Sequence, residues 1–98
     1  MTRKLTPAEI EDRLHQLDGW SVLDGKLHRE YKFPDFVHAF GFMAACAAAA
    51  EARNHHPEWF NAWNRVVVDL TTHDAGGLTG KDFELALVME GFARKLSS

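Results

Sequence analysis

Three histidines near the middle of the chain are the residues best suited to chemistry. His55 and His56 are adjacent and precede a proline, and His73 follows a short run of β-branched residues. Six histidines occur in 98 residues, so half of them fall in this one region. Imidazole changes its charge near neutral pH, so a cluster of imidazoles can hold one ring as an acid and another as a base. The sequence therefore predicts an acid–base site built from His55, His56 and His73.

A metal site is the main alternative for the same residues, because imidazole is the commonest metal ligand in proteins. The chain has a single cysteine, and no two of its histidines have the i, i+4 spacing of a helical zinc motif. A three-histidine site completed by Glu51 or Asp74 stays open at this point. The preferred prediction is acid–base chemistry with no metal and no other cofactor.

Acidic and aromatic side chains near these histidines are candidates to support them. Glu51 precedes His55 by four residues, which would place both on one helix face, where the carboxylate favours the protonated ring. Trp59 and Phe60 could form walls around a bound group, or could be ordinary core residues. The residues taken alone indicate an acid–base site with aromatic walls.

The elements that would position this site can be placed by patterning. Thr6-Pro7-Ala8-Glu9 is typical of a capped helix start, and that helix is expected to end at Asp18-Gly19. Strands are expected over residues 20–23 and Lys26–Phe33, joined by a two-residue turn at Asp24-Gly25. Alternation along the second strand predicts one core-facing side and one wet side.

A long helix is expected from its N-cap Asp35 to about Arg53, since Pro57 forces His56 out of the helical region. The predicted core-facing stripe of this helix is Phe36, Phe40, Met43, Ala47 and Ala50. The alanine-rich second half could pack on the sheet of this chain or on a helix of a second subunit, and both alternatives stay open.

The second half of the chain alternates again over Trp63–Leu70, and a further short strand could lie in Glu58–Asn61. Thr79 with Asp82 is typical of a capping box, so a last helix is expected to begin there. Together the elements predict an α+β fold in one domain, residues 1–98. It would contain an antiparallel sheet of about four strands with three helices packed on one face.

Composition excludes several classes of protein. The formal net charge is −3 and the lysines and arginines are scattered, so no basic patch indicates nucleic-acid binding. No run of 18 apolar residues is present, which argues against a membrane span. Cys46 lies in an alanine-rich run and is expected to be a buried free thiol. With no apolar signal core near the start, we expect a cytoplasmic protein.

The chain resembles the pterin-4a-carbinolamine dehydratase family over nearly its whole length. The resemblance rests on these motifs: Gly19-Trp20, Phe33-x-x-Phe36, Glu51-x-x-x-His55-His56-Pro57-Glu58-Trp59-Phe60-Asn61, Asn64-x-Val66, Thr72-His73 and Gly77-Leu78-Thr79-x-x-Asp82. The double histidine before Pro-x-Trp, followed by a strand and Thr-His, is the most specific part. What the resemblance implies is a dehydratase that removes water from a 4a-hydroxytetrahydropterin to give the quinonoid dihydropterin. Such an enzyme recycles the pterin cofactor of aromatic amino acid hydroxylases.

The resemblance also implies roles for particular residues. His55, His56 and His73 would be the catalytic trio, with His55 and His73 exchanging acid and base roles and His56 orienting or replacing one of them. The residues expected at the substrate or supporting the trio are Glu51, Trp59, Phe60, Thr72 and Asp82. For Asp82, helix capping is an equally good interpretation.

Two other interpretations stay open beside the enzyme. The family includes animal members that stabilise dimers of a transcription factor, so the fold could serve as a protein-dimerisation module with its alanine-rich helix as the contact. It could also be a pterin-binding protein without turnover, for example in molybdopterin metabolism. The expected partners are a small-molecule pterin and further copies of the chain, as a homodimer or homotetramer.

Overall fold

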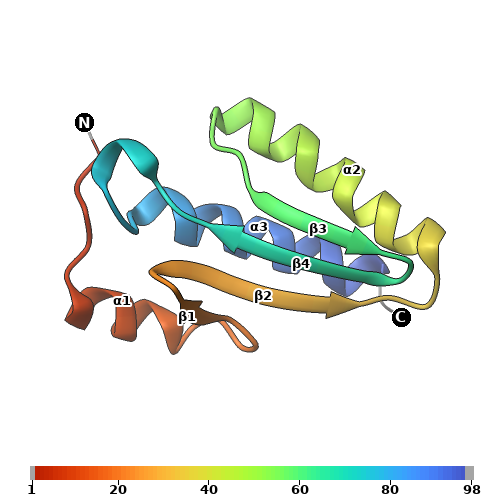
Figure 1. The fold of residues 1–98 in the computed structure, drawn as a ribbon, viewed down its shortest axis with the longest axis horizontal. Coiled ribbons are helices and arrows are strands. Elements are labelled where there is room, and N and C mark those ends of the chain that lie inside the picture. The colour runs from red at the N-terminus through yellow and green to blue at the C-terminus, as the bar shows by residue number, and fades with distance from the viewer. Residues whose placement is uncertain (1, 97–98) are drawn as a thin grey trace.

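The structure is a computed structural model that describes residues 2–96. Figure 1 shows its helices and strands in their order along the chain. The elements are α1 (Pro7–Leu14), β1 (Ser21–Leu23), β2 (Lys26–Lys32), α2 (Phe36–Arg53), β3 (Glu58–Ala62), β4 (Arg65–Leu70), the 3₁₀ helix η1 (His73–Ala75) and α3 (Gly80–Leu96). The possible short strand before Trp63 is therefore present, as β3. No helix among residues 2–96 is long and apolar enough to cross a membrane.

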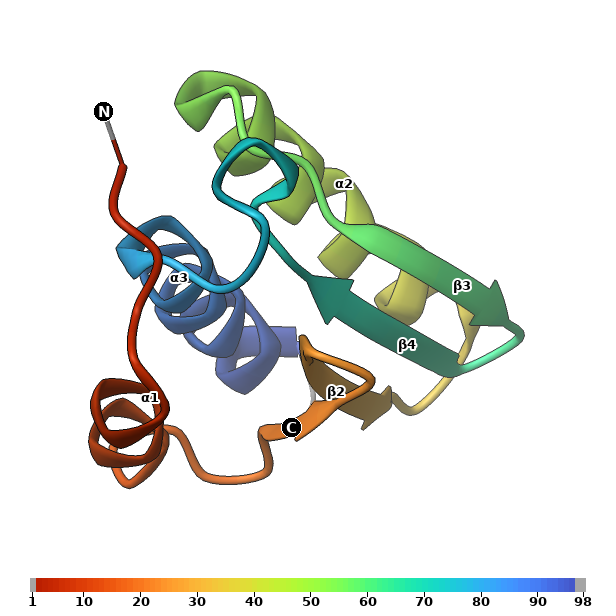
Figure 2. The same ribbon diagram turned by 60° about the vertical axis from the view of Figure 1, so that its left-hand side comes forward.

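The four strands form one antiparallel sheet in the order β1-β2-β4-β3. Figure 2 shows β4 between β2 and β3. β4 is central and pairs on both sides: Val66 lies opposite Tyr31 of β2 and opposite Asn61 of β3. β3 forms one edge of the sheet. This register places the last residue of β4, Leu70, beside the start of β2 at Leu27, so the chain leaves the sheet there and enters η1.

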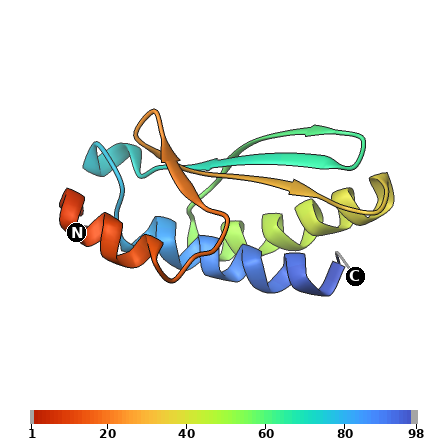
Figure 3. The same cartoon turned by 90° about the horizontal axis from the view of Figure 1, so that it is seen from below.

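All three helices lie on the same side of the sheet, and the other side is uncovered in this chain (Figure 3). The sheet residues that face the helices are fully or almost fully buried: Leu27, Tyr31, Phe33, Val66, Val68 and Leu70. The predicted α+β class, with four antiparallel strands and three helices on one face, is confirmed. The alternation along β2 and β4 carried this prediction, because a strand with one covered face buries every second residue.

The first helix is shorter than predicted. It begins with the expected capping box between Thr6 and Glu9, but it ends at Leu14 rather than at Asp18-Gly19. The chain then turns so that Leu17 and Trp20 are both buried. Gly19 has φ +86°, and a Cβ there would lie 2.4 Å from the guanidinium of Arg29. The positive φ therefore favours glycine here, whereas the flexible Arg29 side chain can move away from a Cβ.

The predicted core-facing stripe of α2 was right at Ala50, which is buried, and at Met43, which packs against the core, but wrong elsewhere. The buried residues are Ala39, Phe42, Cys46 and Ala50, whereas Phe36 and Phe40 are 49% and 55% exposed. Phe42 packs on the rings of Tyr31 and Phe33, with centroids 4.8 and 5.0 Å apart. These contacts with β2 fix which side of the helix faces the core. The small buried residues Ala39 and Cys46, one turn before and one turn after Phe42, let the helix approach the sheet.

β4 begins two residues later than predicted, because Trp63 belongs to a turn. Ala62 pairs with Arg65, and Trp63 between them has φ +49°. The side-chain amide of Asn61 donates to the carbonyls of Trp63 at 3.1 Å and of Arg65 at 2.8 Å. Asn61 therefore stabilises a turn that the large Trp63 side chain does not favour.

Candidate active site

The end of α2 places the first two histidines. Asn54 adopts a left-handed conformation, with φ 49° and ψ 43°, and its N–H bonds back to the carbonyls of Ala50 and Glu51. The N–H of His55 also donates to the Ala50 carbonyl, at 3.1 Å. This closing turn satisfies the last carbonyls of the helix and redirects the chain toward β3. As a result His55 is buried, whereas the adjacent His56 is exposed.

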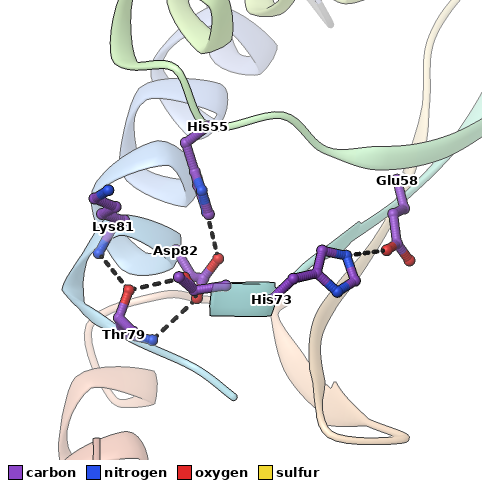
Figure 4. A network of polar contacts seen from close by, with 7 residues as sticks. His55, Glu58, His73, Thr79, Lys81 and Asp82 are labelled. Atoms are coloured by element: carbon purple, nitrogen blue, oxygen red, sulfur yellow. Dashed lines mark hydrogen bonds and ion pairs between the residues drawn. The ribbon is translucent and has the colours of Figure 1, made fainter. Parts of the chain in front are cut away.

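His55 is held by a buried carboxylate in the first turn of α3. Its Nε2 lies 2.6 Å from Oδ1 of Asp82, whose side chain is fully buried (Figure 4). The other oxygen, Oδ2, accepts a hydrogen bond from the hydroxyl of Thr72 at 2.8 Å and one from the N–H of Thr79 at 3.0 Å. The same carboxylate therefore caps α3 and orients His55.

The carboxylate also sets the direction of each hydrogen bond in this network. An ionised carboxylate only accepts, so the Thr72 hydroxyl donates to Asp82 and accepts from the Thr79 hydroxyl 2.8 Å away. The Thr79 oxygen accepts in turn from the N–H of Lys81 at 3.2 Å. By the same reasoning His55 donates its Nε2–H to Asp82, which leaves Nδ1 as the nitrogen that can exchange a proton.

His56 is paired with a carboxylate of its own helix. Its Nε2 lies 2.8 Å from Oε1 of Glu51, and both side chains are mostly exposed. The predicted pairing of Glu51 with His55 was wrong, because the left-handed turn at Asn54 takes His55 off the helix face where i, i+4 spacing applies. An exposed pair of this kind contributes roughly 0–1 kcal/mol, so Glu51 holds His56 only loosely.

His73 opens the 3₁₀ helix that follows β4, and its side chain is 77% exposed. Its Nε2 lies 3.1 Å from Oε2 of Glu58, and the two side chains point toward each other (Figure 4). The other oxygen of Glu58 accepts a hydrogen bond from Nζ of Lys26. These bonds, chiefly the one from Lys26, lower the pKa of Glu58 below its usual value. Three elements, β2, β3 and η1, thus meet at one carboxylate.

All three histidines contribute to the wall of one open pocket of about 260 Å³. Its lining comes from the end of α2, the end of β4, η1 and the start of α3: Asn54, His55, His56, Thr71, Thr72, His73, Asp74 and Lys81. This volume lies near the lower end of the usual range for ligand pockets, which suits a small heterocycle that stays partly open to solvent.

Each histidine in this wall is paired through Nε2 with a different carboxylate: His55 with Asp82, and the others with Glu51 and Glu58. Within residues 2–96, no group of three or more His, Cys, Asp or Glu side chains is arranged to hold a metal ion. A carboxylate on Nε2 favours the Nε2–H tautomer and leaves Nδ1 to accept or donate a proton. The arrangement suits proton transfer to and from a bound molecule.

The remaining predicted site residues lie at or outside the edge of this pocket. Thr72 is part of the lining, whereas Asp82 is buried behind His55 and cannot touch a ligand directly. Trp59 packs against the core, and Phe60 is 56% exposed on the uncovered face of the sheet. Neither ring lines the pocket in this chain, so their contact with a heterocycle stays a prediction.

Sequence reasoning missed Glu58 and Lys26 as supporting residues, and Lys81 and Thr71 as part of the pocket lining. The available signal was the alternation on the uncovered face, where Lys26 and Glu58 project from different strands. Using that signal required knowing that β4 lies between β2 and β3.

Comparison with known proteins relates this arrangement to one family. Residues 3–92 match the family model described as Pterin 4 alpha carbinolamine dehydratase. A protein of Solibacter usitatus, provisionally named a pterin-4-alpha-carbinolamine dehydratase, is 60% identical over 95% of this chain and 98% of its own length. A protein of Burkholderia multivorans with the same provisional name is 50% identical over 95% of this chain and 93% of its own length.

A solved structure from Brucella melitensis, titled a transcriptional coactivator/pterin dehydratase, shares the fold. Its TM-score is 0.90 at 48% sequence identity, and the match covers 93% of this chain and 99% of that one. Similarity at this level extends through all the elements that build the pocket.

Proposed function

Because the chain belongs to the pterin-4-alpha-carbinolamine dehydratase family, we propose that it dehydrates a 4a-hydroxytetrahydropterin by histidine acid–base catalysis. The observation that carries the proposal is the shared pocket, in which three imidazoles each have Nε2 bound to a carboxylate.

The reaction needs two proton transfers. The bond between C4a and its hydroxyl oxygen breaks, and an acid must protonate that oxygen because hydroxide is a poor leaving group. The electron pair of N5 forms the new C4a=N5 bond, and a base takes the N5 proton. The products are quinonoid dihydropterin and water, and the acid and base are restored by exchanging protons with each other or with solvent.

The geometry suggests how the histidines divide this work. His55 is buried and bonded to Asp82, so its Nδ1 occupies a fixed position in the pocket wall. His73 approaches from η1 on a different element, and the two rings are the proposed acid and base. The partner of His56, Glu51, is 81% exposed, against 43% for the partner of His73, and we assign His56 to orienting the substrate or replacing one of the others. General acid–base catalysis of this kind accelerates a reaction by roughly 10²–10⁴-fold.

The test is a stopped-flow measurement of carbinolamine decay with and without the protein. We expect acceleration by the unaltered chain and a decrease of about tenfold or more in H73A, at the low end of what one acid or base contributes. The matched control is H38A, because His38 pairs with Asp35 at the start of α2, away from the pocket. No acceleration by the unaltered chain would refute the function. Loss of activity with a chelator and its return with zinc would favour the metal alternative.

The proposed physiological role is recycling of the pterin cofactor used by aromatic amino acid hydroxylases. The family membership supports it, and the quinonoid product is the oxidised form that such recycling would return to the tetrahydro state. A hydroxylase assay supplemented with the protein tests this: we expect faster return of usable cofactor, and an unchanged rate would contradict the role.

A second candidate function, assembly with itself or with another protein, is favoured by an exposed apolar face on α2. Phe36, Val37 and Phe40 are 49%, 75% and 55% exposed, and the Phe36 and Phe40 rings contact each other. Alanines continue this face toward the end of the helix. We propose that it joins copies of the chain into a homodimer or homotetramer, since a patch of this kind is otherwise costly to leave in water.

A further inference from the structure

We propose that Glu58 is the positioning residue for His73 and that Lys26 holds Glu58 in place. This inference rests on the proposed function, in which His73 exchanges a proton with the substrate. It adds a residue that does not touch the substrate but determines which nitrogen of His73 faces it.

The contacts of Glu58 provide the geometric basis. Its two carboxylate oxygens bind different partners: Oε1 accepts from Nζ of Lys26, and Oε2 lies 3.1 Å from Nε2 of His73. Glu58 is the first residue of β3, and its backbone position is fixed by pairing with Asp69 of β4. The carboxylate is therefore anchored through both its main chain and its second oxygen.

His73 needs such an anchor more than the other proposed proton-transfer residue does. It starts a 3₁₀ helix of only three residues, and its side chain is 77% exposed, against 10% for His55. An exposed side chain on a short turn changes rotamer on the picosecond-to-nanosecond timescale unless something holds it. Because the carboxylate can only accept, the bond to Glu58 also selects the Nε2–H tautomer and leaves Nδ1 of His73 for the substrate.

Glu58 acts on His73 as Asp82 acts on His55, but from the surface. Asp82 is immobilised by burial, whereas the Glu58 side chain is 43% exposed and depends on Lys26. The hydrogen bond from Lys26 is also the main cause of the lowered pKa of Glu58, so the carboxylate stays ionised wherever His73 can act. Because Glu58 is at the surface, the His73 ring can move aside when a ligand enters. The buried Asp82 does not allow this for His55.

The charged groups around Glu58 come from each neighbouring element. Lys26 faces it from β2, His73 from η1, and Asp69 lies opposite it on β4. Asp69 is itself paired with His28, at 2.8 Å. The carboxylate that bonds His73 is therefore that of Glu58.

The experiment compares E58Q with a matched variant, E30Q. Glu30 lies on the same uncovered sheet face and also forms an ion pair, with Arg65 at 3.3 Å, but it does not contact His73. We expect E58Q to lower the population of the Nε2–H tautomer of His73, followed by ¹⁵N NMR, because a neutral amide is a weaker acceptor than a carboxylate. We also expect kcat for dehydration to fall about twofold to fivefold with KM unchanged.

Variants of Lys26 test whether Glu58 must be held in place to act on His73. K26M should lower kcat in the same direction as E58Q, because Glu58 is then free to leave His73. K32M, which removes an exposed lysine at the other end of β2, should have no effect.

The outcomes separate the two proposals. An unaltered chain without dehydratase activity refutes the proposed function, whatever the NMR spectra show. An active unaltered chain in which E58Q and E30Q have the same His73 tautomer population and the same kcat refutes the positioning role of Glu58. A loss confined to KM would also refute it, because it would place Glu58 in substrate binding.

Discussion

Replacing Asp82 by asparagine should reverse the tautomer of His55 and slow dehydration about 100-fold, at the low end of what general acid–base catalysis contributes. The orientation of the new amide is dictated by Thr79, whose backbone N–H can only donate and lies 3.0 Å from Oδ2. The amide oxygen must take that position, so the NH₂ group must take the position of Oδ1, 2.6 Å from Nε2 of His55. His55 then accepts at Nε2 and carries its proton on Nδ1, where it can no longer serve as a base.

The cost to folding should be much smaller than the cost to catalysis. The bonds from Thr72 and Thr79 are retained but lose their charged acceptor, which weakens each by about 1 kcal/mol. Part of this loss of about 2 kcal/mol is offset because a neutral amide is easier to bury than a carboxylate. A domain of ordinary stability, about 5–15 kcal/mol, remains folded after such a loss.

The assay is stopped-flow decay of the carbinolamine, with urea unfolding to measure the free energy of unfolding of each variant. T72S is the matched control, because it keeps the hydroxyl that donates to Asp82. D82N should retain its fold and substrate affinity while kcat falls, and the imidazole nitrogens of His55 should show an Nδ1–H tautomer by NMR. A folded D82N protein that dehydrates the substrate within about twofold of the unaltered rate would refute the assigned role of Asp82 and His55.

Three further predictions follow from other contacts. E51Q should change kcat less than about twofold, because the Glu51–His56 pair is exposed, and a tenfold loss by stopped flow would contradict this. Burial, reinforced by Glu90, raises the pKa of Tyr31 above the unfolded value near 10, so the folded state holds a proton that the unfolded state has released. Stability measured by urea unfolding should therefore fall above pH 10, with up to about 1.4 kcal/mol per pH unit from Tyr31. Burial raises the pKa of Cys46 from 9.0 to about 12, so Cys46 adds a second decrease of up to the same size per pH unit, which begins at lower pH and remains in Y31F. F40D should give a smaller species than the unaltered chain by analytical ultracentrifugation. L87D, which alters an equally exposed leucine of α3, should leave the mass unchanged. Equal masses for F40D and the unaltered chain would exclude the α2 face as the contact.

Local patterns predicted the strands and the capped helix starts because their causes are local. Burial of every second residue along β4, at Val66, Val68 and Leu70, follows from a sheet covered on one face. The capping box at Thr6 and the N-cap at Asp35 depend on side chains three residues from the backbone groups they satisfy. Such features can be identified from the sequence without knowing what packs against them.

The errors in the predicted fold arise where contacts between side chains, rather than the local sequence pattern, determine the structure. The face of α2 was predicted from its large rings, but the contact of Phe42 with Tyr31 and Phe33 selects a different face and leaves Phe40 exposed. The start of β4 was placed too early, because nothing in Trp63 indicates a positive φ. The deciding partners of Phe42 are on another element, whereas the turn at Trp63 is stabilised by Asn61, two residues earlier.

In the candidate site, too, features set by the local sequence were predicted and features set by distant residues were not. Pro57 indicated that α2 must stop before His56, but it gave no indication of the left-handed turn at Asn54 that separates His55 from Glu51. The partners actually chosen are distant in sequence: Asp82 lies 27 residues from His55, and Glu58 lies 15 residues from His73. The residue types for acid–base chemistry, and Glu51 and Asp82 as supporting carboxylates, could therefore be identified from the sequence, but which carboxylate pairs with which histidine could not.

The carboxylates of the three histidine–carboxylate pairs form a series in burial, and this series argues for a division of labour. The side chains of His55 and Asp82 are 10% and 0% exposed, those of His73 and Glu58 77% and 43%, and those of His56 and Glu51 57% and 81%. A buried pair keeps its geometry without substrate, whereas an exposed pair reorganises at little cost. We therefore expect His55 to define where the reacting atoms must lie and His73 to adjust to the bound pterin. Mutations of Asp82 should consequently lower kcat far more than mutations of Glu58, and mutations of Glu51 should matter least.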